Sequence, residues 1–483
     1  MSHPPAGLTR IARLAALLAL ILPAAIASGL AVAPAEAAIG RATTVSLTFD
    51  DGNANQMSAA TILKRYGLKG TFFINSGFVG APGYLTDANL ATLKANGQEI
   101  GGHSLSHPDL TNLPIDEVKR QVCNDRAALL GKGFAVRSFA YPFASVSPAV
   151  ETAVKDCGYN SARALGDLGI PGDPECVGCP PAATLPPTDP YATEALPQVE
   201  STWKLSDLQG AVTRAERTGG WVQFTFHNVC AASAKCELNV TPTTLEQFAL
   251  WLSLRGILRN TVVKTVGDTI GGAVAPAVTG PVATPAGPGV NGVVNPGMET
   301  LNSDGTPQCW MKGGYGANTA VLDLATPGRS GDRAGRVTMS GYTDGDAKWL
   351  PQFDLGGCSP SVAAGHTYSM RQWYTSTGVT QFAIYLRNSA GVWAYWTSSP
   401  WFAASPTFTQ ATWTTPEIPA GMTGISFGLN VFGNGTLTTD DSALYDSVGA
   451  PDPVTDPLPT PAVAPQVSKV AEPQATESDV AGG

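Results

Sequence analysis

Two adjacent carboxylates, Asp50 and Asp51, follow an apolar run and are candidates for catalysis at a metal ion. Two histidines, His103 and His107, lie four residues apart farther along the chain. If their segment is helical, both rings project from one face and can reach the same ion. One carboxylate and two imidazoles can hold a divalent metal while leaving positions open for water and substrate, as catalytic sites do. Because neighbouring side chains diverge, we expect one aspartate to bind the metal and the other to transfer protons.

A third histidine, His227, ends the apolar run at residues 221–226 and could donate a proton to a leaving group. Taken singly, an Asp-Asp-Gly turn and a structural histidine are the simpler interpretations. Together these residues favour a site, because each follows a β-like segment, where α/β folds place their catalytic groups.

The elements that must position these residues alternate between strand and helix. Strands are predicted at residues 44–49, 71–75, 99–102, 135–143, 161–164 and 221–226. Helices are predicted at residues 58–66, 88–95, 115–130, 205–217 and 243–254. This alternation predicts an α/β fold with a mostly parallel sheet, and the length suits a barrel.

Four segments, in order, resemble the motifs of the polysaccharide deacetylases, also known as NodB-homology or carbohydrate esterase family 4 proteins. They are TFDDG at 48–52, HSLSH at 103–107, FAYPF at 139–143 and FH at 226–227. The resemblance covers about residues 40–268. It implies a distorted (β/α) barrel that removes acetyl groups from sugar polymers with a divalent metal, usually zinc.

The resemblance also implies a role for each matching residue. Asp50 becomes the general base, His227 the general acid, and Asp51, His103 and His107 the metal ligands. The backbone N–H of Phe143 would stabilise the oxyanion, and Tyr141 and Trp203 would line the acetyl pocket.

Three positions depart from the family pattern. Ala140 stands where the family commonly has an arginine that pairs with the base, and Arg137 is the candidate substitute. Trp203 follows Thr202 instead of the usual aspartate, and Thr225 replaces a leucine two residues before the last histidine.

The first 37 residues are predicted to be a secretory signal peptide. Arg10 and Arg13 precede an apolar stretch at 14–22, and residues 35–37 form an Ala-Glu-Ala cleavage site. A membrane anchor is the alternative for this stretch. We therefore expect a secreted, extracellular protein with no stable membrane span after the signal is removed.

The 8 cysteines favour disulfides, because export leads to an oxidising compartment. Cys176 and Cys179 could instead form half of a zinc ribbon with Cys230 and Cys236. Cys309 and Cys358 are predicted to form a disulfide within the second domain.

The formal net charge of -9 argues against nucleic acid or an anionic membrane surface as a partner. A polysaccharide or oligosaccharide substrate fits this charge better.

Composition divides the rest of the chain. A catalytic domain is predicted over residues 38–270 and a Pro/Gly/Ala linker over 271–292. Short alternating strands predict an all-β sandwich at 293–449, and a disordered Pro-rich tail follows at 450–483.

The second domain contains many aromatic residues. Trp393, Tyr395 and Trp396 crowd one segment, where strand alternation leaves at least one ring exposed to stack on sugars. The ends of this domain resemble those of β-sandwich carbohydrate-binding modules, and the resemblance implies a structural calcium ion held by Glu299 and Asp441.

The leading hypothesis is a secreted, metal-dependent hydrolase that removes acetyl groups from a polysaccharide, N-acetyl rather than O-acetyl. An acetylxylan-type O-acetyl esterase is one alternative, and a catalytically dead glycan-binding protein is another. Two histidines and a carboxylate also suit Fe(II) oxygenation, but a second aspartate and a histidine acid fit hydrolysis better.

Overall fold

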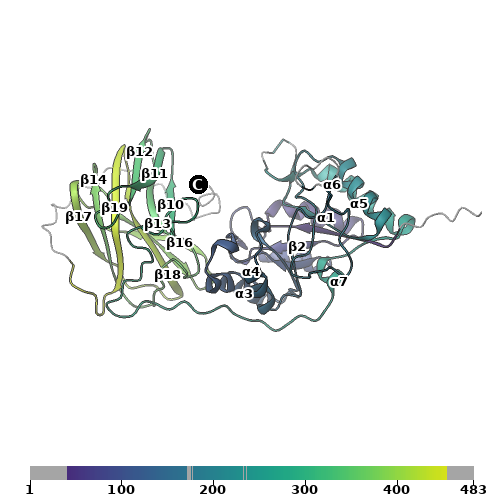
Figure 1. The fold of residues 1–483 in the computed structure, drawn as a ribbon, viewed down its shortest axis with the longest axis horizontal. Coiled ribbons are helices and arrows are strands. Elements are labelled where there is room, and N and C mark those ends of the chain that lie inside the picture. The colour runs from purple at the N-terminus through teal and green to yellow at the C-terminus, as the bar shows by residue number, and fades with distance from the viewer. Residues whose placement is uncertain (1–40, 171–175, 177, 232, 235, 454–483) are drawn as a thin grey trace, which may run out of the picture. The chain divides into compact units, whose positions relative to one another are not determined.

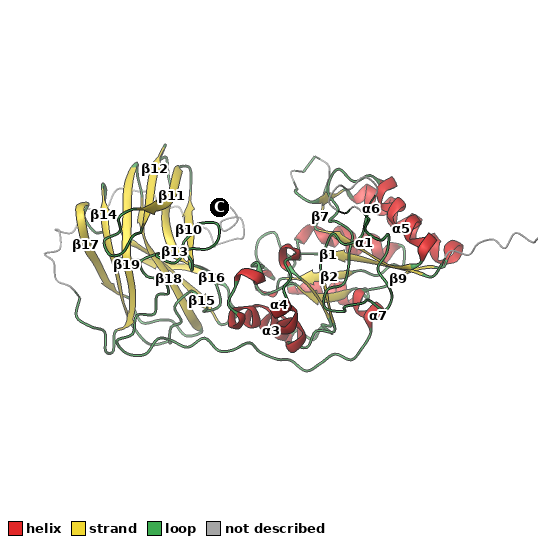
Figure 2. Ribbon diagram, in the orientation of Figure 1, coloured by secondary structure: helices red, strands yellow, loops and turns green. Residues whose placement is uncertain are grey.

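The computed structural model describes residues 41–170, 176, 178–231, 233–234 and 236–453. These residues form a domain built on a parallel β-sheet and a domain built from two antiparallel sheets (Figures 1 and 2). The predicted signal peptide and nearly all of the predicted tail lie outside the described residues.

The first domain is built on a parallel sheet with the strand order β5-β4-β3-β2-β1-β6, in which β9 also pairs with β1. β1 is buried along its whole length, as expected for an apolar strand at the centre of such a sheet. The strands are β1 (Thr43–Phe49), β2 (Thr71–Ile74), β3 (Glu99–Gly102), β4 (Ser138–Ala140), β5 (Ser161–Arg163), β6 (Gly220–Phe226) and β9 (Thr261–Val263).

Helices follow most of these strands in the chain (Figure 2). The sequence sets several of their ends: the Thr86 side chain caps α2 by accepting from Asn89 N, and Gly97, with φ +76°, follows its last turn. The helices are α1 (Met57–Arg65), α2 (Asp87–Ala95), α3 (Ile115–Gly131), α4 (Pro148–Asp156), α5 (Leu205–Thr218), α6 (Pro242–Arg259) and α7 (Val266–Ile270).

Irregular chain closes the gap between the outer strands β5 and β6. Ala164 N donates to Thr193 O at 3.1 Å on the β5 side, and Leu196 N donates to Gln223 O at 3.1 Å on the β6 side. The domain is therefore the distorted (β/α) barrel that the sequence predicted.

The strand predicted at 135–143 is shorter than expected. β4 ends at Ala140, and residues 142–144 form a short 3-10 turn. Pro142 lacks a backbone N–H, and Phe143 and Ala144 both have φ +55°, which no strand allows.

Four disulfides lie in the described residues. They join Cys123 to Cys157, Cys176 to Cys179, Cys230 to Cys236 and Cys309 to Cys358. The bridge predicted between Cys309 and Cys358 is confirmed. The zinc-ribbon alternative is wrong, because all four of its cysteines are in disulfides. The Cys230–Cys236 loop follows β7 (Asn228–Val229), which pairs with β8 (Asn239–Val240).

The second domain is a β-sandwich, as predicted. Its two sheets have the orders β10-β13-β18-β15-β16 and β11-β12-β19-β14-β17, and side chains such as Trp349, Met370 and Phe427 form the core. The strands are β10 (Trp310–Tyr315), β11 (Thr319–Ala325), β12 (Ala334–Ser340), β13 (Asp346–Pro351), β14 (Tyr368–Ser376), β15 (Phe382–Asn388), β16 (Trp393–Ser398), β17 (Ser405–Thr414), β18 (Met422–Val431) and β19 (Gly435–Asp446).

Among the described residues, no helix has the length and apolar character needed to cross a membrane.

Candidate active site

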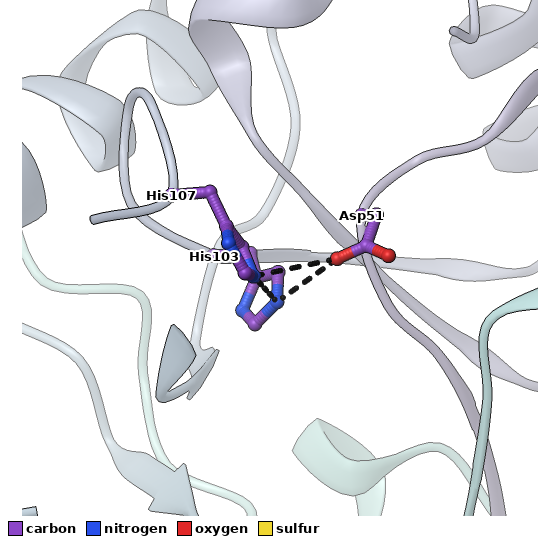
Figure 3. Close-up of side chains that lie close together, drawn as sticks. All are labelled: Asp51, His103 and His107. Atoms are coloured by element: carbon purple, nitrogen blue, oxygen red, sulfur yellow. Dashed lines mark hydrogen bonds and ion pairs between the residues drawn. The ribbon is translucent and has the colours of Figure 1, made fainter. Parts of the chain in front are cut away.

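Asp51, His103 and His107 meet at the carboxyl ends of β1 and β3 (Figure 3). Asp51 Oδ1 lies 3.4 Å from His103 Nε2 and 3.5 Å from His107 Nε2. The two Nε2 atoms are 3.2 Å apart. Three ligand atoms from the predicted metal set thus converge on one point.

The segment that carries the histidines is a loop, so the helical spacing expected for it is wrong. Ser104 has φ +66° and His107 has φ +57°, and His107 N donates to Ser104 Oγ at 3.0 Å. These left-handed residues bring His107 back towards His103. Asp51 is also left-handed, with φ +74°, and such backbone geometry is common where function fixes a side chain.

The ring of His103 is oriented for metal binding. Its Nδ1 lies 2.8 Å from the carbonyl oxygen of Ala140. When Nδ1 donates its hydrogen there, Nε2 presents a lone pair towards Asp51 and His107. A carboxylate and two imidazoles oriented in this way fit a divalent ion such as zinc.

The electrostatics of Asp51 and His103 reflect their contact. Burial acts to raise the pKa of Asp51, but the hydrogen bond and charge of His103, with the charges of His227 and His107, outweigh it and hold that pKa well below its usual range. Burial acts to lower the pKa of His103, but Asp51 and then Asp50 outweigh it, and the pKa is raised. A metal must therefore displace a proton that His103 holds tightly.

Asp50 is held by Arg163, at the end of β5. Arg163 Nη2 forms an ion pair with Asp50 Oδ2, and both side chains are buried. Asp50 Oδ1 is buried without a hydrogen-bond partner among the described residues. A carboxylate with one oxygen anchored by an arginine and the other free of protein hydrogen bonds is suited to accept a proton.

The base-orienting role expected for Arg137 is wrong. Its guanidinium forms an ion pair with Asp268 at 3.0 Å, because residue 137 precedes β4 and lies towards the amino end of the sheet. Arg163 was missed by the sequence reasoning. The available signal was a charged side chain at the end of the strand predicted at 161–164.

Gln56 was also missed, and it links Asp50 to His227. Its Nε2 donates to the backbone carbonyl of Asp50 and, at 2.9 Å, to that of His227. Asp50 N also donates to Phe226 O at 2.9 Å. The backbones of Asp50 and His227 are therefore linked at the ends of β1 and β6. His227 Nδ1 is buried without a partner in the described part of the chain.

The three predicted pocket residues differ in exposure. Phe143 is exposed, and its ring lies edge-on to His107 with 4.8 Å between centroids. Tyr141 is buried, and its hydroxyl donates to Tyr191 O at 2.8 Å. Trp203 is half-buried against the domain core. Phe143 therefore lies at the metal site, whereas the pocket roles of Tyr141 and Trp203 stay predictions.

The aromatic cluster in the sandwich is divided between core and surface. Trp393 is buried and stacks on Phe353 with 4.8 Å between centroids, so its glycan-stacking assignment is wrong. Trp396 is partly buried against the core, whereas Tyr395 is exposed. Successive side chains of a strand point to opposite faces, so Tyr395 lies on the surface while Trp396 faces the core.

The residues proposed for calcium have protein partners. Asp441 forms an ion pair with Arg329 at 2.6 Å, and Glu299 accepts from Arg333 N at 2.9 Å. A calcium ion would compete with these arginines, and its presence stays a prediction.

A family model described as polysaccharide deacetylase matches residues 38–162. The peptidoglycan-N-acetylglucosamine deacetylase PgdA of Listeria monocytogenes is 31% identical over 110 residues, 22% of this chain and 22% of that protein. The peptidoglycan-N-acetylmuramic acid deacetylase PdaA of Bacillus subtilis is 33% identical over 81 residues, 16% of this chain and 29% of that protein. The match thus spans less than a third of each relative.

Two solved structures also match the chain. A family 4 acetyl xylan esterase from Clostridium thermocellum, solved with a cobalt ion, is 21% identical and covers 47% of this chain and 90% of its own, with a TM-score of 0.33. The peptidoglycan deacetylase PdaC from Bacillus subtilis is 18% identical with the same coverages and a TM-score of 0.32.

Residues 38–162 therefore match the polysaccharide deacetylase family, in agreement with the resemblance stated from the motifs.

Proposed function

We propose that the protein is a secreted, divalent-metal-dependent hydrolase that removes N-acetyl groups from a polysaccharide. The observation that carries the proposal is that Asp51, His103 and His107 bring three possible ligand atoms together, with Asp50 next to Asp51 in the chain. One oxygen of Asp50 is paired with Arg163, and the other has no hydrogen-bond partner among the described residues. The relatives named for peptidoglycan deacetylation support N-acetyl groups as the target. Four disulfides support export.

Asp51, His103 and His107 would hold the metal, for which zinc is our proposal. A divalent ion at such a site polarises a carbonyl and makes water more acidic. Asp50 Oδ1 accepts the proton of the attacking water, and Arg163 holds this carboxylate in place through the ion pair to Oδ2. His227 donates a proton to the departing sugar nitrogen, so the amide C–N bond breaks and acetate and a free amine are formed.

The backbone N–H of Phe143 is our proposal for the donor to the developing oxyanion. Its support is the position of this residue against His107. The exposed ring of Phe143 would lie beside a bound sugar.

We further propose that the sandwich domain binds glycan through Tyr395. Its exposure supports this role, since flat rings at a surface can stack on sugars.

The test is acetate release from N-acetylated peptidoglycan, chitin oligomers, poly-N-acetylglucosamine and acetylated xylan. We expect release from at least one N-acetylated polymer, loss of release on chelation, and recovery when zinc is added. Release from acetylated xylan alone would establish the ester alternative. Glycan binding without any release would establish the non-enzymatic alternative, and release that survives chelation would contradict metal dependence.

A further inference from the structure

Among the described residues, α6 exposes more large apolar side chains than any other helix or strand. They are Leu250, Leu254, Ile257 and Leu258, which we call the α6 apolar face. At 3.6 residues per turn these positions fall within an arc of about 100°. The core-facing residues of the same helix, such as Phe248 and Leu252, lie on the opposite side. α6 is therefore apolar on two sides, and only one of them is covered.

The α6 apolar face extends to the end of the domain opposite the active site. Thr43 pairs with Gly220 and with Thr261, so β1, β6 and β9 begin together. α5 and α6 directly precede β6 and β9, and both helices therefore end near the start of β1. The metal ligands lie at the carboxyl end of the same sheet.

This end of the domain is also basic, although the chain as a whole is acidic. Arg41, Arg217 and Arg259 are exposed here and form no ion pair within the described residues. The acidic Glu216 is already paired with Arg255 and accepts from Thr261 Oγ1 at 2.7 Å. Exposed arginines thus remain at the end of the domain where α6 ends.

We propose that the α6 apolar face and its flanking arginines form a docking surface for an anionic phospholipid bilayer. Exposed leucine and isoleucine on a helix can insert into the interfacial region of such membranes, and exposed arginines at the same end of the domain attract the anionic headgroups. With α6 on the lipid, the active site faces away from the membrane, towards polymer outside it.

A second copy of the chain is a poorer fit to this surface. Four side chains cannot bury the roughly 1,200 Å² that a stable protein interface needs. A lipid surface needs no such area, because each arginine adds its own attraction to anionic headgroups.

The test is co-sedimentation of the chain from residue 38 with vesicles of phosphatidylglycerol and phosphatidylcholine, or of phosphatidylcholine alone. This chain retains both described domains and lacks the apolar stretch at 14–22. We expect binding to the anionic vesicles and little to the neutral ones. Ile257→Asp should weaken binding by about tenfold, because the transfer of one such side chain into lipid is lost. The doubly substituted R217S/R259S chain should weaken binding to anionic vesicles by a similar factor.

Val282→Asp is the matched control, since Val282 in the linker is 87% exposed and Ile257 is 86% exposed. It adds the same charge and should leave binding unchanged. Acetate release from a soluble oligosaccharide should be the same in all these variants, so failure of the lipid proposal is distinguishable from failure of the proposed activity. Absence of sedimentation with anionic vesicles, or equal weakening by Val282→Asp, would overturn the proposal. So would a dimer in light scattering that Ile257→Asp dissociates, since a second copy would then occupy the face.

Discussion

Arg163 forms a buried ion pair with Asp50, although 113 residues separate them in the sequence. The guanidinium comes from the end of β5 and the carboxylate from the end of β1. Ala140 is fully buried and uses its carbonyl oxygen to orient His103 instead. The arginine that the family commonly supplies from position 140 is thus replaced from a neighbouring strand.

Replacing Arg163 with methionine should lower both activity and stability. Asp50 would lose its anchor, and kcat should fall by about 10²-fold, within the range of general-base effects. Removal of one partner from a buried pair should also lower the free energy of unfolding by about 3 kcal/mol or more. Steady-state kinetics and chemical denaturation measure the two effects.

Arg137→Met is the control, because its partner Asp268 lies outside the site and is half exposed. It should leave kcat unchanged. In the doubly substituted R163M/D50N chain, stability should recover in part, because the Asp50 charge that Arg163→Met leaves unpaired is also removed. Activity should stay lost, because the proposed base is gone. Full activity in the Arg163→Met variant would contradict the assignment.

Gln56→Leu should lower kcat by about tenfold without loss of bound zinc. The variant leaves the carbonyls of Asp50 and His227 without this donor, so base and acid lose their common support. The pH profile of kcat should become broader or shift, which a purely structural effect on folding would not cause. An unchanged profile with unchanged kcat would show that Gln56 does not position these groups.

Zinc affinity should fall as the pH falls, and the fall should begin above the ordinary histidine range. The pKa of His103 is raised, chiefly because its hydrogen bond with Asp51 outweighs burial. Below that raised pKa the ring carries a proton and cannot be a ligand, so each zinc ion must displace it. Zinc titrations at about pH 6 and about pH 8 measure this difference, and equal affinities would contradict it.

Trp393 and Tyr395, the buried and the exposed ring of the sandwich aromatic cluster, should respond differently to replacement by alanine. Trp393→Ala should lower the free energy of unfolding by about 3 to 5 kcal/mol, because it empties a buried ring site against Phe353. Tyr395→Ala should leave stability unchanged and weaken binding to the polymer that the catalytic domain cleaves. Denaturation and polymer pull-down assays distinguish these outcomes, and unchanged pull-down of the Tyr395→Ala chain would remove Tyr395 from the binding surface.

The sequence predicts the sheet and the convergence of Asp51, His103 and His107 because both depend on local patterns. Apolar runs mark β1 and β6, and Asp50, His103 and His227 directly follow β1, β3 and β6. Because the carboxyl ends of parallel strands lie at one edge of the sheet, the fold class alone predicts that these residues come together.

The partners of Asp50 could not be predicted in the same way. Arg163 reaches it only because β5 and β1 converge in the closed barrel, and irregular chain around Thr193 and Leu196 completes that closure. The left-handed turns at Ser104 and His107 also carry no sequence signal, since neither residue is glycine or asparagine. The helix predicted to end at 254 continues to Arg259 and stops at Asn260, whose backbone is left-handed with φ +57°.

The most direct test of the proposed chemistry is acetate release from an N-acetylated glycan by the zinc-loaded chain and by its Asp50→Asn variant. The variant keeps the size of the side chain and the three metal ligands but cannot accept the proton of water. We expect the native chain to release acetate and the variant to bind zinc equally well but release acetate at least about 10²-fold more slowly. Equal rates for the two proteins would contradict the assignment of Asp50 as the base.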